Sequence, residues 1–328
     1  MKFTETMLEN FSQPLSETEN QQCLHTIRMV SEALKQIGFT DDGKEIAPLY
    51  SDTYAYSIRM RNDSYGRKIK LLVQGSYANN TNVRTESDVD IAVIQEDVFD
   101  PEYRTGYPTQ SNADYGFIPA KPSIKSFKDE VQECLVQKFG KDVERKDKSI
   151  KVHGNTYRKD ADTVPCLRYR DYRKDYRKDA NNYIGGIIIV SDKGERIINY
   201  PEQHISNGRQ KNVATNKYYK KFVRIIKKMR HLMEDSDIFS YKKAASKVSS
   251  FMLESLLWNI PDKWYLENCG IYRKVFSFRQ MINWLKEHKS YFSSFKEANN
   301  IKLLCADQNE CNNLCDFIDQ LSEFYQYE

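Results

Sequence analysis

Residues 74–94 read QGSYANNTNVRTESDVDIAVI. Gly75-Ser76 directly follows the short apolar run KIKLLVQ (residues 68–74), and Asp88 directly precedes a second run, VDIAVI (residues 89–94), which contains Asp90. These β-branched runs, with polar residues between them, predict a strand, a turn with a short helix, and a second strand. Strand residues two apart point to the same face, so Asp88 and Asp90 project side by side. Adjacent carboxylates repel each other unless a cation lies between them, which predicts a site for hard divalent metal ions.

The Gly75-Ser76 turn offers a place for phosphate. Glycine lets the backbone approach a phosphate without a Cβ in the way, and Ser76 adds a hydroxyl and an N–H donor at a helix start. A third acid is expected on another strand: Asp162 has apolar neighbours in DADTVPC, and Asp160, with the same strand parity, is the alternative. Two metal ions roughly 3.5 to 4 Å apart would activate an attacking hydroxyl and steady a leaving pyrophosphate.

Periodicity divides the chain into a mixed first part and a helical last part. The expected strands are residues 68–74, 89–94, 148–152, 161–167, 184–190 and 196–199. The expected helices are residues 17–37, 48–62, 123–139, 215–234, 244–259, 276–289 and 309–325, with residues 99–122 as a loop and Ser123 or Ser126 as the N-cap of the third helix.

Strands followed by helices predict an α+β fold with two lobes. We expect a catalytic lobe with a mixed sheet over residues 1–205 and a helical lobe over residues 206–328. The N-terminal helix, residues 17–37, is expected to cross back and pack on the helical lobe.

Composition narrows the class of protein. The chain has 328 residues, of which 40% are hydrophobic and 29% charged, as in a globular protein of two joined lobes. Its 50 basic and 46 acidic residues give a net charge of +4, so the charge balance requires no nucleic-acid partner. The sequence has no apolar stretch near the roughly 18 to 20 residues of a membrane span and no signal-peptide pattern, so we expect a cytoplasmic protein. Seven scattered cysteines favour reduced thiols.

The order of Gly-Ser, polar spacer, Asp-x-Asp and a later lone acid on a strand resembles nucleotidyltransferases of the polymerase-beta type. Residues 74–94 are similar in more detail to the bacterial cGAS/DncV-like nucleotidyltransferases, the CD-NTases of antiphage signalling. Residues 160–166 resemble the third-acid strand of that family, residues 199–230 its segment leading into the helical lobe, and residues 249–261 its helix beneath the nucleotide base.

This resemblance implies a set of site residues. Gly75 and Ser76 would hold the donor triphosphate. Two magnesium ions, or manganese in their place, would be bound by Asp88, Asp90 and Asp162, and the last of these would also help to activate the acceptor hydroxyl. In the helical lobe, contacts to phosphates or base would come from one residue of each of two pairs, Lys217 or Lys220 and Ser249 or Ser250.

The implied activity is synthesis of a cyclic di- or trinucleotide second messenger from nucleoside triphosphates. The product would activate a separate effector in defence against phage, and the enzyme would act as a monomer without requiring membrane or nucleic acid. One alternative is a polymerase-like transferase that adds nucleotides to RNA or protein, although the near-balanced charge favours small-molecule substrates. The other alternative is a catalytically silent nucleotide sensor.

Three further charged features have two interpretations each. His204 could be a general base, but metal activation makes one unnecessary, and a structural role in the turn before the helical lobe is favoured. Arg224, Lys227 and Lys228 share a helix side that could face a nucleotide cleft or a nucleic-acid activator, although a solvated face is favoured. Residues 168–179 (RYRDYRKDYRKD) could stack on bases and pair with phosphates, but their aspartates favour a solvated face.

Overall fold

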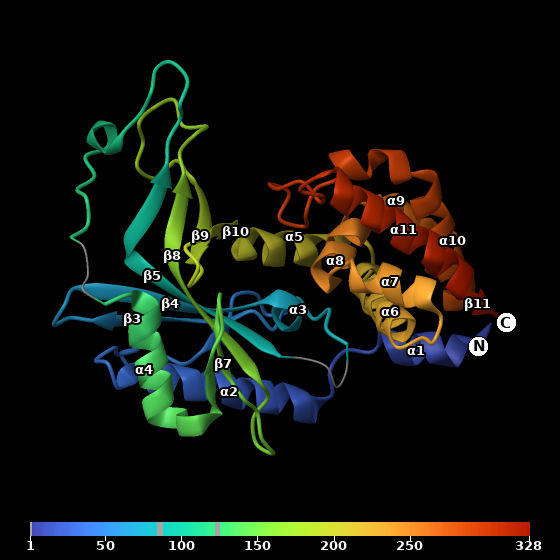
Figure 1. The fold of residues 1–328 in the computed structure, drawn as a ribbon, viewed down its shortest axis with the longest axis horizontal. Helices are drawn as coiled ribbons and strands as arrows, with labels where there is room; N and C mark the ends of the chain where they lie inside the picture. The colour runs from blue at the N-terminus through green and yellow to red at the C-terminus, as the bar shows by residue number, and fades with distance from the viewer. Residues whose placement is uncertain (1, 84–87, 122–124) are drawn as a thin grey trace. The chain divides into compact units, whose positions relative to one another are not determined.

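The apolar runs before residue 200 pair into one mixed sheet, seen in a computed structural model that describes residues 2–83, 88–121 and 125–328 (Figure 1). In sheet order its main strands are β10 (Arg196–Asn199), β9 (Ile184–Val190), β8 (Ala161–Asp171), β5 (Val89–Glu102), β4 (Arg67–Gln74), β3 (Tyr56–Asn62) and β2 (Ala47–Pro48). A side branch pairs with β8 and consists of β7 (Ile150–Val152) and β6 (Val143–Arg145). Neighbouring β5 and β8 run parallel, whereas β4 runs antiparallel to β5 and β7 antiparallel to β8.

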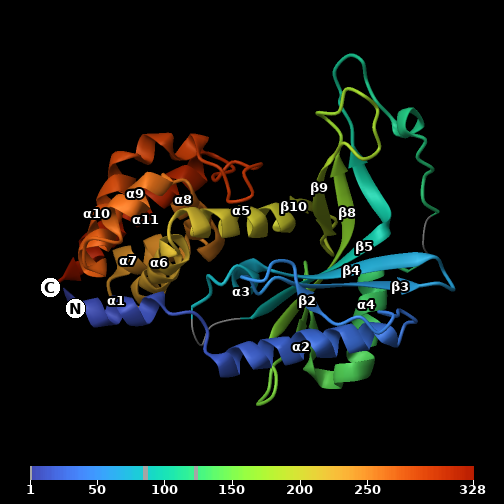
Figure 2. The same ribbon diagram turned by 180° about the vertical axis from the view of Figure 1, so that it is seen from behind.

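Two helices pack along the sheet, α2 (Glu17–Lys35) against β5 and α4 (Phe127–Phe139) against β8 (Figure 2). The predicted helical spacing of α2 is confirmed, because it buries five apolar residues to 1% exposure or less: Cys23, Ile27, Val30, Ala33 and Leu34. At the start of α4 the hydroxyl of Ser126 accepts from the N–H of Asp129 at 3.1 Å. The other predicted N-cap, Ser123, lies outside the described residues.

Two segments of this sheet differ from the prediction. A helix is predicted over residues 48–62, with Pro48 in its first turn, but that prediction is wrong, since β3 alternates buried Ile58 and Met60 with exposed arginines and pairs with β4. β5 extends past the predicted end at residue 94 and reaches Glu102, after an irregularity in its pairing with β8. A bulge of this kind lets a strand continue through residues that interrupt its alternation.

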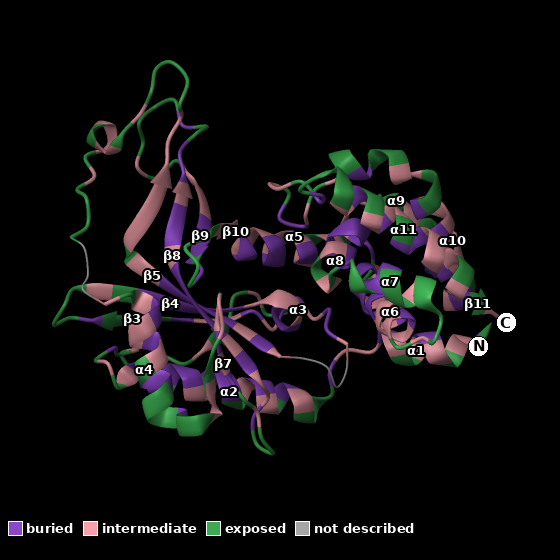
Figure 3. Cartoon of the chain, viewed as in Figure 1, coloured by how far each residue is buried: buried purple, intermediate pink, exposed green. Residues whose placement is uncertain are grey.

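The remaining helices form a second compact unit around α6. They are α1 (Glu5–Ser12), α5 (Pro201–Ala214), α6 (Tyr218–Glu234), α7 (Phe239–Ser246), α8 (Ser250–Trp258), α9 (Asp262–Asn268), α10 (Lys274–Glu287) and α11 (Gln308–Phe324). α6 packs against α1, α7, α8 and α11, and its buried positions stand out in Figure 3. The single helix predicted over residues 244–259 is wrong, because α7 ends at Ser246 and Ser249 caps the start of α8.

The chain ends lie together in this helical unit. β1 (Lys2–Phe3) pairs in parallel with β11 (Gln326–Tyr327), and Phe3 stacks on Tyr325 with ring centroids 5.3 Å apart. The ribbon shows both termini beside one another (Figure 1). Among the helices of the described residues, none combines the length and the apolar character that crossing a membrane demands. All seven cysteines are free thiols, and six are buried.

The two compact units differ from the expected lobes. The helical unit consists of Met1–Ser16, Ala78–Ser87 and Glu202–Glu328, and the sheet unit of Glu17–Tyr77 and Asp88–Pro201. The expected boundary between residues 205 and 206 falls just inside the last segment of the helical unit, and the other two segments of that unit lie before it. The helix expected over residues 17–37 is α2, which belongs to the sheet unit, and α1 is the N-terminal helix that packs on α6 and α10.

Candidate active site

Asp90 and Asp162 lie side by side at the starts of two parallel strands. Asp90 on β5 is in register with Asp162 on β8, and Lys151 on β7 is the partner of Asp162 on its other side. Cross-strand neighbours point to the same face of a sheet, so these side chains share one face, and Asp88, two residues before Asp90, shares it too. All three aspartates are partly exposed. The structure thus brings the predicted acids together at one edge of the sheet.

Gly75 follows β4 directly and fits closely against this edge. Its φ of +70° is a conformation that glycine adopts readily and other residues rarely adopt. A Cβ here would lie 2.1 Å from Asp90 Oδ2, so the carboxylate occupies the space that any other side chain would need. Sequence reasoning ascribes the missing Cβ to the approach of a phosphate, and the structure adds the approach of Asp90. Ser76 comes next, half-buried in the one-turn helix α3 (Gly75–Ala78).

Tyr77 anchors this turn within the sheet unit. Its buried ring stacks on Tyr54 with centroids 5.5 Å apart, and its hydroxyl donates to Asn20 Oδ1 of α2 at 2.6 Å. Burial raises the pKa of the Tyr77 hydroxyl well above its ordinary range, so the group stays protonated as a donor. Sequence reasoning missed this anchor because no spacing rule connects Tyr77 with residues so far away in the chain.

The structure distinguishes the two candidates for the third acid. Asp160 accepts from the N–H of Gly154 at 2.6 Å and from Lys151 Nζ at 2.6 Å, so both of its oxygens are engaged. Burial alone would raise the pKa of Asp160, but the hydrogen bonds from Lys151 and Gly154 bring it below its ordinary value. Asp162 instead contacts Ser149 Oγ at 3.2 Å, beside Asp90. These contacts make Asp162 the better placed partner of Asp90.

The donor chemistry of this edge fits a hard divalent cation. Three carboxylates on one face supply the oxygen ligands that magnesium and manganese prefer. With the side chains as they stand, the described part of the chain has no group of three acidic, histidine or cysteine side chains close enough to hold a metal ion. Ammonium groups lie against the carboxylates instead, with Lys151 Nζ at 3.1 Å from Asp88 Oδ2 and Lys146 Nζ at 3.6 Å from Asp162 Oδ1.

Known proteins share a similar sequence and the same fold. The chain is 44% identical over 328 residues to the cyclic GMP-AMP synthase CdnE03 of Staphylococcus schleiferi, covering 100% of this chain and 98% of that relative. The chain is a CD-NTase, a cGAS/DncV-like nucleotidyltransferase. Residues 206–326 match the C-terminal helical domain of that family.

Two further relatives cover most of this CD-NTase. The cyclic dipyrimidine nucleotide synthase CdnE of Cecembia lonarensis is 35% identical over 263 residues, which is 80% of this chain and 77% of that protein. The structure of the Rhodothermus marinus CdnE c-UMP-AMP synthase with Apcpp and Upnpp superposes with a TM-score of 0.73 at 26% identity, over 99% of this chain and 98% of that chain. The predicted family and the polymerase-beta-like α+β fold are thereby confirmed.

The candidate nucleotide contacts of the CD-NTase helical unit differ in exposure. Lys217 is exposed just before α6, with a φ of +66°, whereas Lys220 is buried on α6 at 5% exposure. Ser249 is the N-cap of α8 and accepts from the N–H of Met252 at 3.0 Å, while Ser250 is the first, half-buried residue of that helix. Ser249 therefore has a demonstrable structural role.

A buried ionic network occupies the centre of the helical unit. Glu254 on α8 accepts from Lys227 Nζ at 2.7 Å and from Thr81 Oγ1 at 2.6 Å, and its other oxygen lies 2.9 Å from His204 Nε2. Burial would raise the pKa of Glu254, but the charges of Lys227 and His204 lower it well below its ordinary value. Arg224, also buried, donates to the carbonyl of Asn80 and so holds the same segment as Thr81.

This network corrects two interpretations. On the predicted solvated side, Arg224 and Lys227 are buried at 5% and 2% exposure, and only Lys228 is partly exposed. His204 lies within α5, where it is buried against Glu254, so the structural role is placed in a helix and not in a turn. Sequence rules assign charged residues to the surface, and they fail here because each charge finds a buried partner far along the chain.

Residues 168–179 are also more structured than a solvated face. Tyr172 is fully buried among aromatic rings that include Tyr115 at 4.6 Å. Asp175, with no exposed surface, accepts from the Tyr115 hydroxyl at 2.8 Å and from the Asn182 amide at 2.7 Å. Only Tyr176 of the repeated tyrosines is exposed, and the guanidinium of Arg104 lies 3.5 Å from its ring centroid.

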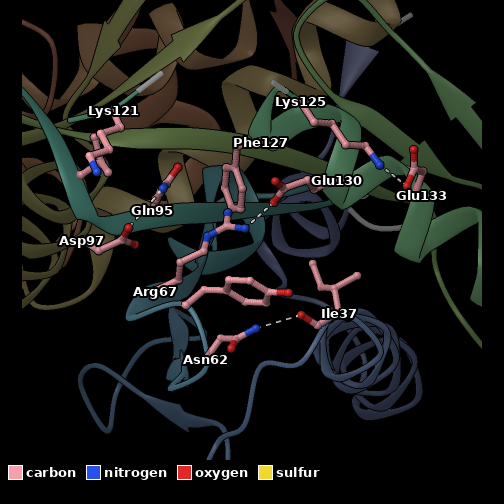
Figure 4. Close-up of a pocket in the computed structure, with 12 residues that line it drawn as sticks. Ile37, Asn62, Arg67, Gln95, Asp97, Lys121, Lys125, Phe127, Glu130 and Glu133 are labelled. Atoms are coloured by element: carbon pink, nitrogen blue, oxygen red, sulfur yellow. Dashed lines mark hydrogen bonds and ion pairs between the residues drawn. The ribbon is translucent and has the colours of Figure 1, made fainter. Parts of the chain in front are cut away.

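A separate cavity of about 500 Å³ lies beside α4 in the sheet unit (Figure 4). Arg67 Nη1 lies 2.5 Å from Glu130 Oε2, and its guanidinium stands 5.6 and 5.4 Å from the ring centroids of Phe39 and Phe127. Gly75, Ser76 and the three aspartates are absent from its lining. Because none of those predicted residues lines it, this cavity is distinct from the phosphate site that the sequence predicts.

Proposed function

We propose that this CD-NTase joins nucleoside triphosphates into a cyclic dinucleotide at the edge formed by β4, β5 and β8. The observation that carries the proposal is the in-register pair Asp90 and Asp162, with Asp88 on the same face and Gly75 against Asp90. Full-length similarity to a cyclic GMP-AMP synthase supports it, and so does the structural likeness to a c-UMP-AMP synthase with two nucleotide analogues. GTP and ATP are the substrates we expect, because the relative that is 44% identical is named for that product.

The roles follow from the chemistry of each residue. Gly75 and Ser76 would receive the donor triphosphate, through backbone N–H groups and the serine hydroxyl. Asp88, Asp90 and Asp162 would hold two magnesium or manganese ions, and Asp162 would lie nearest the acceptor sugar. When bound, such ions lower the pKa of the attacking hydroxyl and neutralise the leaving pyrophosphate. The three aspartates would hold the positive charges of these ions on one face of the sheet. A second nucleotidyl transfer at the same edge would close the ring.

The biological role extends this proposal. We infer that the product activates a separate effector during phage infection, with the enzyme acting as a cytoplasmic monomer. Support for this role is the family resemblance alone. Plating phage on cells that carry the chain with its effector genes tests it, and equal plating on cells with the wild-type chain and with the Asp88→Asn, Asp90→Asn variant would contradict it.

The direct test is product analysis. The pure protein is incubated with all four ribonucleoside triphosphates and magnesium, treated with phosphatase and analysed by mass spectrometry. We expect a phosphatase-resistant cyclic product from the wild type and from Asp97→Asn, a control acid on β5 that accepts from the N–H of Lys68. The Asp88→Asn, Asp90→Asn double variant should make none.

Other products would redirect the assignment. Linear oligonucleotides of increasing length, or nucleotides transferred to RNA or protein, would support the polymerase-like alternative. Triphosphate binding with no product under any metal ion would support the silent sensor. Omission of divalent ions, with EDTA present, should abolish product formation if the metal assignment is right.

A further inference from the structure

Lys151 is positioned between two carboxylates of the proposed metal-binding edge. Its Nζ lies 2.6 Å from Asp160 Oδ2 and 3.1 Å from Asp88 Oδ2, and its side chain is only 15% exposed. Ile150 and Val152, its neighbours on β7, are fully buried, so the strand fixes the position of the Lys151 backbone. The ammonium group is therefore held at the face that Asp90 and Asp162 share.

The two acceptors of Lys151 differ in how firmly they are held. Asp160 is fixed, because its other oxygen accepts from the Gly154 N–H and its carbonyl accepts from the Val89 N–H at 2.9 Å. Asp88 is freer, with a side chain that is 46% exposed and one contact to the lysine. A competing cation could take Asp88 from the lysine while the contact to Asp160 remained.

We propose that Lys151 is a positioning residue that holds Asp88 in the metal-free enzyme, retains Asp160, and releases Asp88 when a divalent ion binds. This inference rests on the proposed metal site. Because the ammonium is a positive charge beside the ligands, it weakens divalent-ion binding and sets the ion concentration that the enzyme needs. Its charge also offsets the repulsion between the carboxylates of Asp88 and Asp160 before the ion binds.

The test measures Mn²⁺ binding to the full chain without nucleotide, by titration calorimetry and by loss of the EPR signal of free Mn²⁺. Lys151→Met should lower the Kd about five-fold at low ionic strength, because one positive charge near the ion is removed. Lys151→Arg keeps the charge and should leave the Kd near the wild-type value. Lys148→Met is the matched control on the same hairpin, since that lysine pairs with Glu195 at 3.5 Å.

A double variant separates the release of Asp88 from the removal of charge. In the Asp88→Asn background Lys151→Met has no Asp88 carboxylate to release, so it should give a smaller change in Kd than it gives alone, and the remaining change comes from the lost charge. Lys151→Gln repeats the test with a polar side chain if Lys151→Met loses cooperative unfolding. If Lys151→Met or Lys151→Gln folds and binds Mn²⁺ no more tightly than wild type, the inference about Lys151 is overturned while the proposed metal site stands. A wild type that binds no Mn²⁺, with or without nucleotide, overturns the proposed metal site and this inference with it.

Discussion

At Gly75, backbone conformation and site geometry impose the same choice of residue. The φ of +70° and the 2.1 Å from a hypothetical Cβ to Asp90 Oδ2 both exclude a side chain. We predict that Gly75→Ala lowers kcat/KM at least about 100-fold, because the methyl group must displace the Asp90 carboxylate and misplaced catalytic groups are costly. Steady-state product formation, read beside a thermal unfolding curve, measures this.

Gly66 provides the matched control for that substitution. It also has a positive φ, +64°, but nothing lies within 4 Å of its added Cβ. Gly66→Ala should lower stability by about 1 kcal/mol and leave kcat/KM nearly unchanged. Equal losses of activity in both variants would show that backbone strain alone, and not contact with Asp90, makes glycine necessary.

Glu254 is the residue on which the buried network of the helical unit depends. Glu254→Gln should lower the free energy of unfolding by about 3 kcal/mol, because Lys227 would lose the charge that balances it. Urea-induced unfolding measures the loss. Glu234→Gln is the control, since it removes only a half-exposed pair with Arg230 and should cost less than about 0.5 kcal/mol.

The same carboxylate gives a pH dependence of known sign. Its pKa in the folded protein lies below its ordinary value of 4.5, so the folded state favours the charged form. The stability advantage of wild type over Glu254→Gln should be full above about pH 5 and shrink as the pH falls through 4.5 and lower. An advantage that grew on acidification would contradict the burial of a charged Glu254 beside Lys227 and His204.

At the scale of elements, the break between α7 and α8 distinguishes two serines. Ser249→Ala should lower stability by about 1 kcal/mol, because the N–H of Met252 loses its cap. We expect Ser250 to be the nucleotide contact of the pair, so that Ser250→Ala raises the KM for triphosphate while stability stays within about 0.5 kcal/mol. Unfolding curves and KM values for both variants decide, and the reverse pattern would assign the contact to Ser249.

The strands of the site could be predicted because their signals are local. An apolar run, a Gly-Ser break and acids of equal parity suffice to place Asp88 and Asp90 together. The apolar neighbours of Asp162 suffice to place that acid on a strand, which pairs with β5. β3 has a local strand signal too, the alternation of Ile58 and Met60 with arginines, and the helix predicted from Pro48 onward disregards it. α5 was missed because its sequence is polar, and it contains Gly208.

The environment of the site depends on partners that are distant in sequence. Lys151 meets Asp88, and Tyr77 meets Asn20, through the register of strands and the packing of α2. Such contacts follow from tertiary structure, and a single sequence contains no spacing that encodes them. The buried positions of Lys227 and Glu254 contradict the rule that charges are solvated, which is why the predicted solvated face was wrong.

At the scale of the whole molecule, the assignment of α1 to the helical unit can be tested by hydrogen exchange. Leu8→Ala on α1 and Leu34→Ala on α2 each remove a fully buried leucine and should each cost about 2 to 5 kcal/mol. Leu8→Ala should reduce protection in α6 and α10, whereas Leu34→Ala should reduce it in the sheet. Loss of protection in α2 and the sheet from Leu8→Ala would contradict the observed units.

The pairing of β1 with β11 has a consequence for synthesis on the ribosome. Phe3 and its partner Tyr327 are far apart in the chain, so Phe3 is made long before Tyr327. At about 5 to 20 residues per second, roughly 20 to 60 s separate the two. Throughout that interval Phe3 lacks its final neighbours, so the helical unit can complete its core only after β11 has been synthesised.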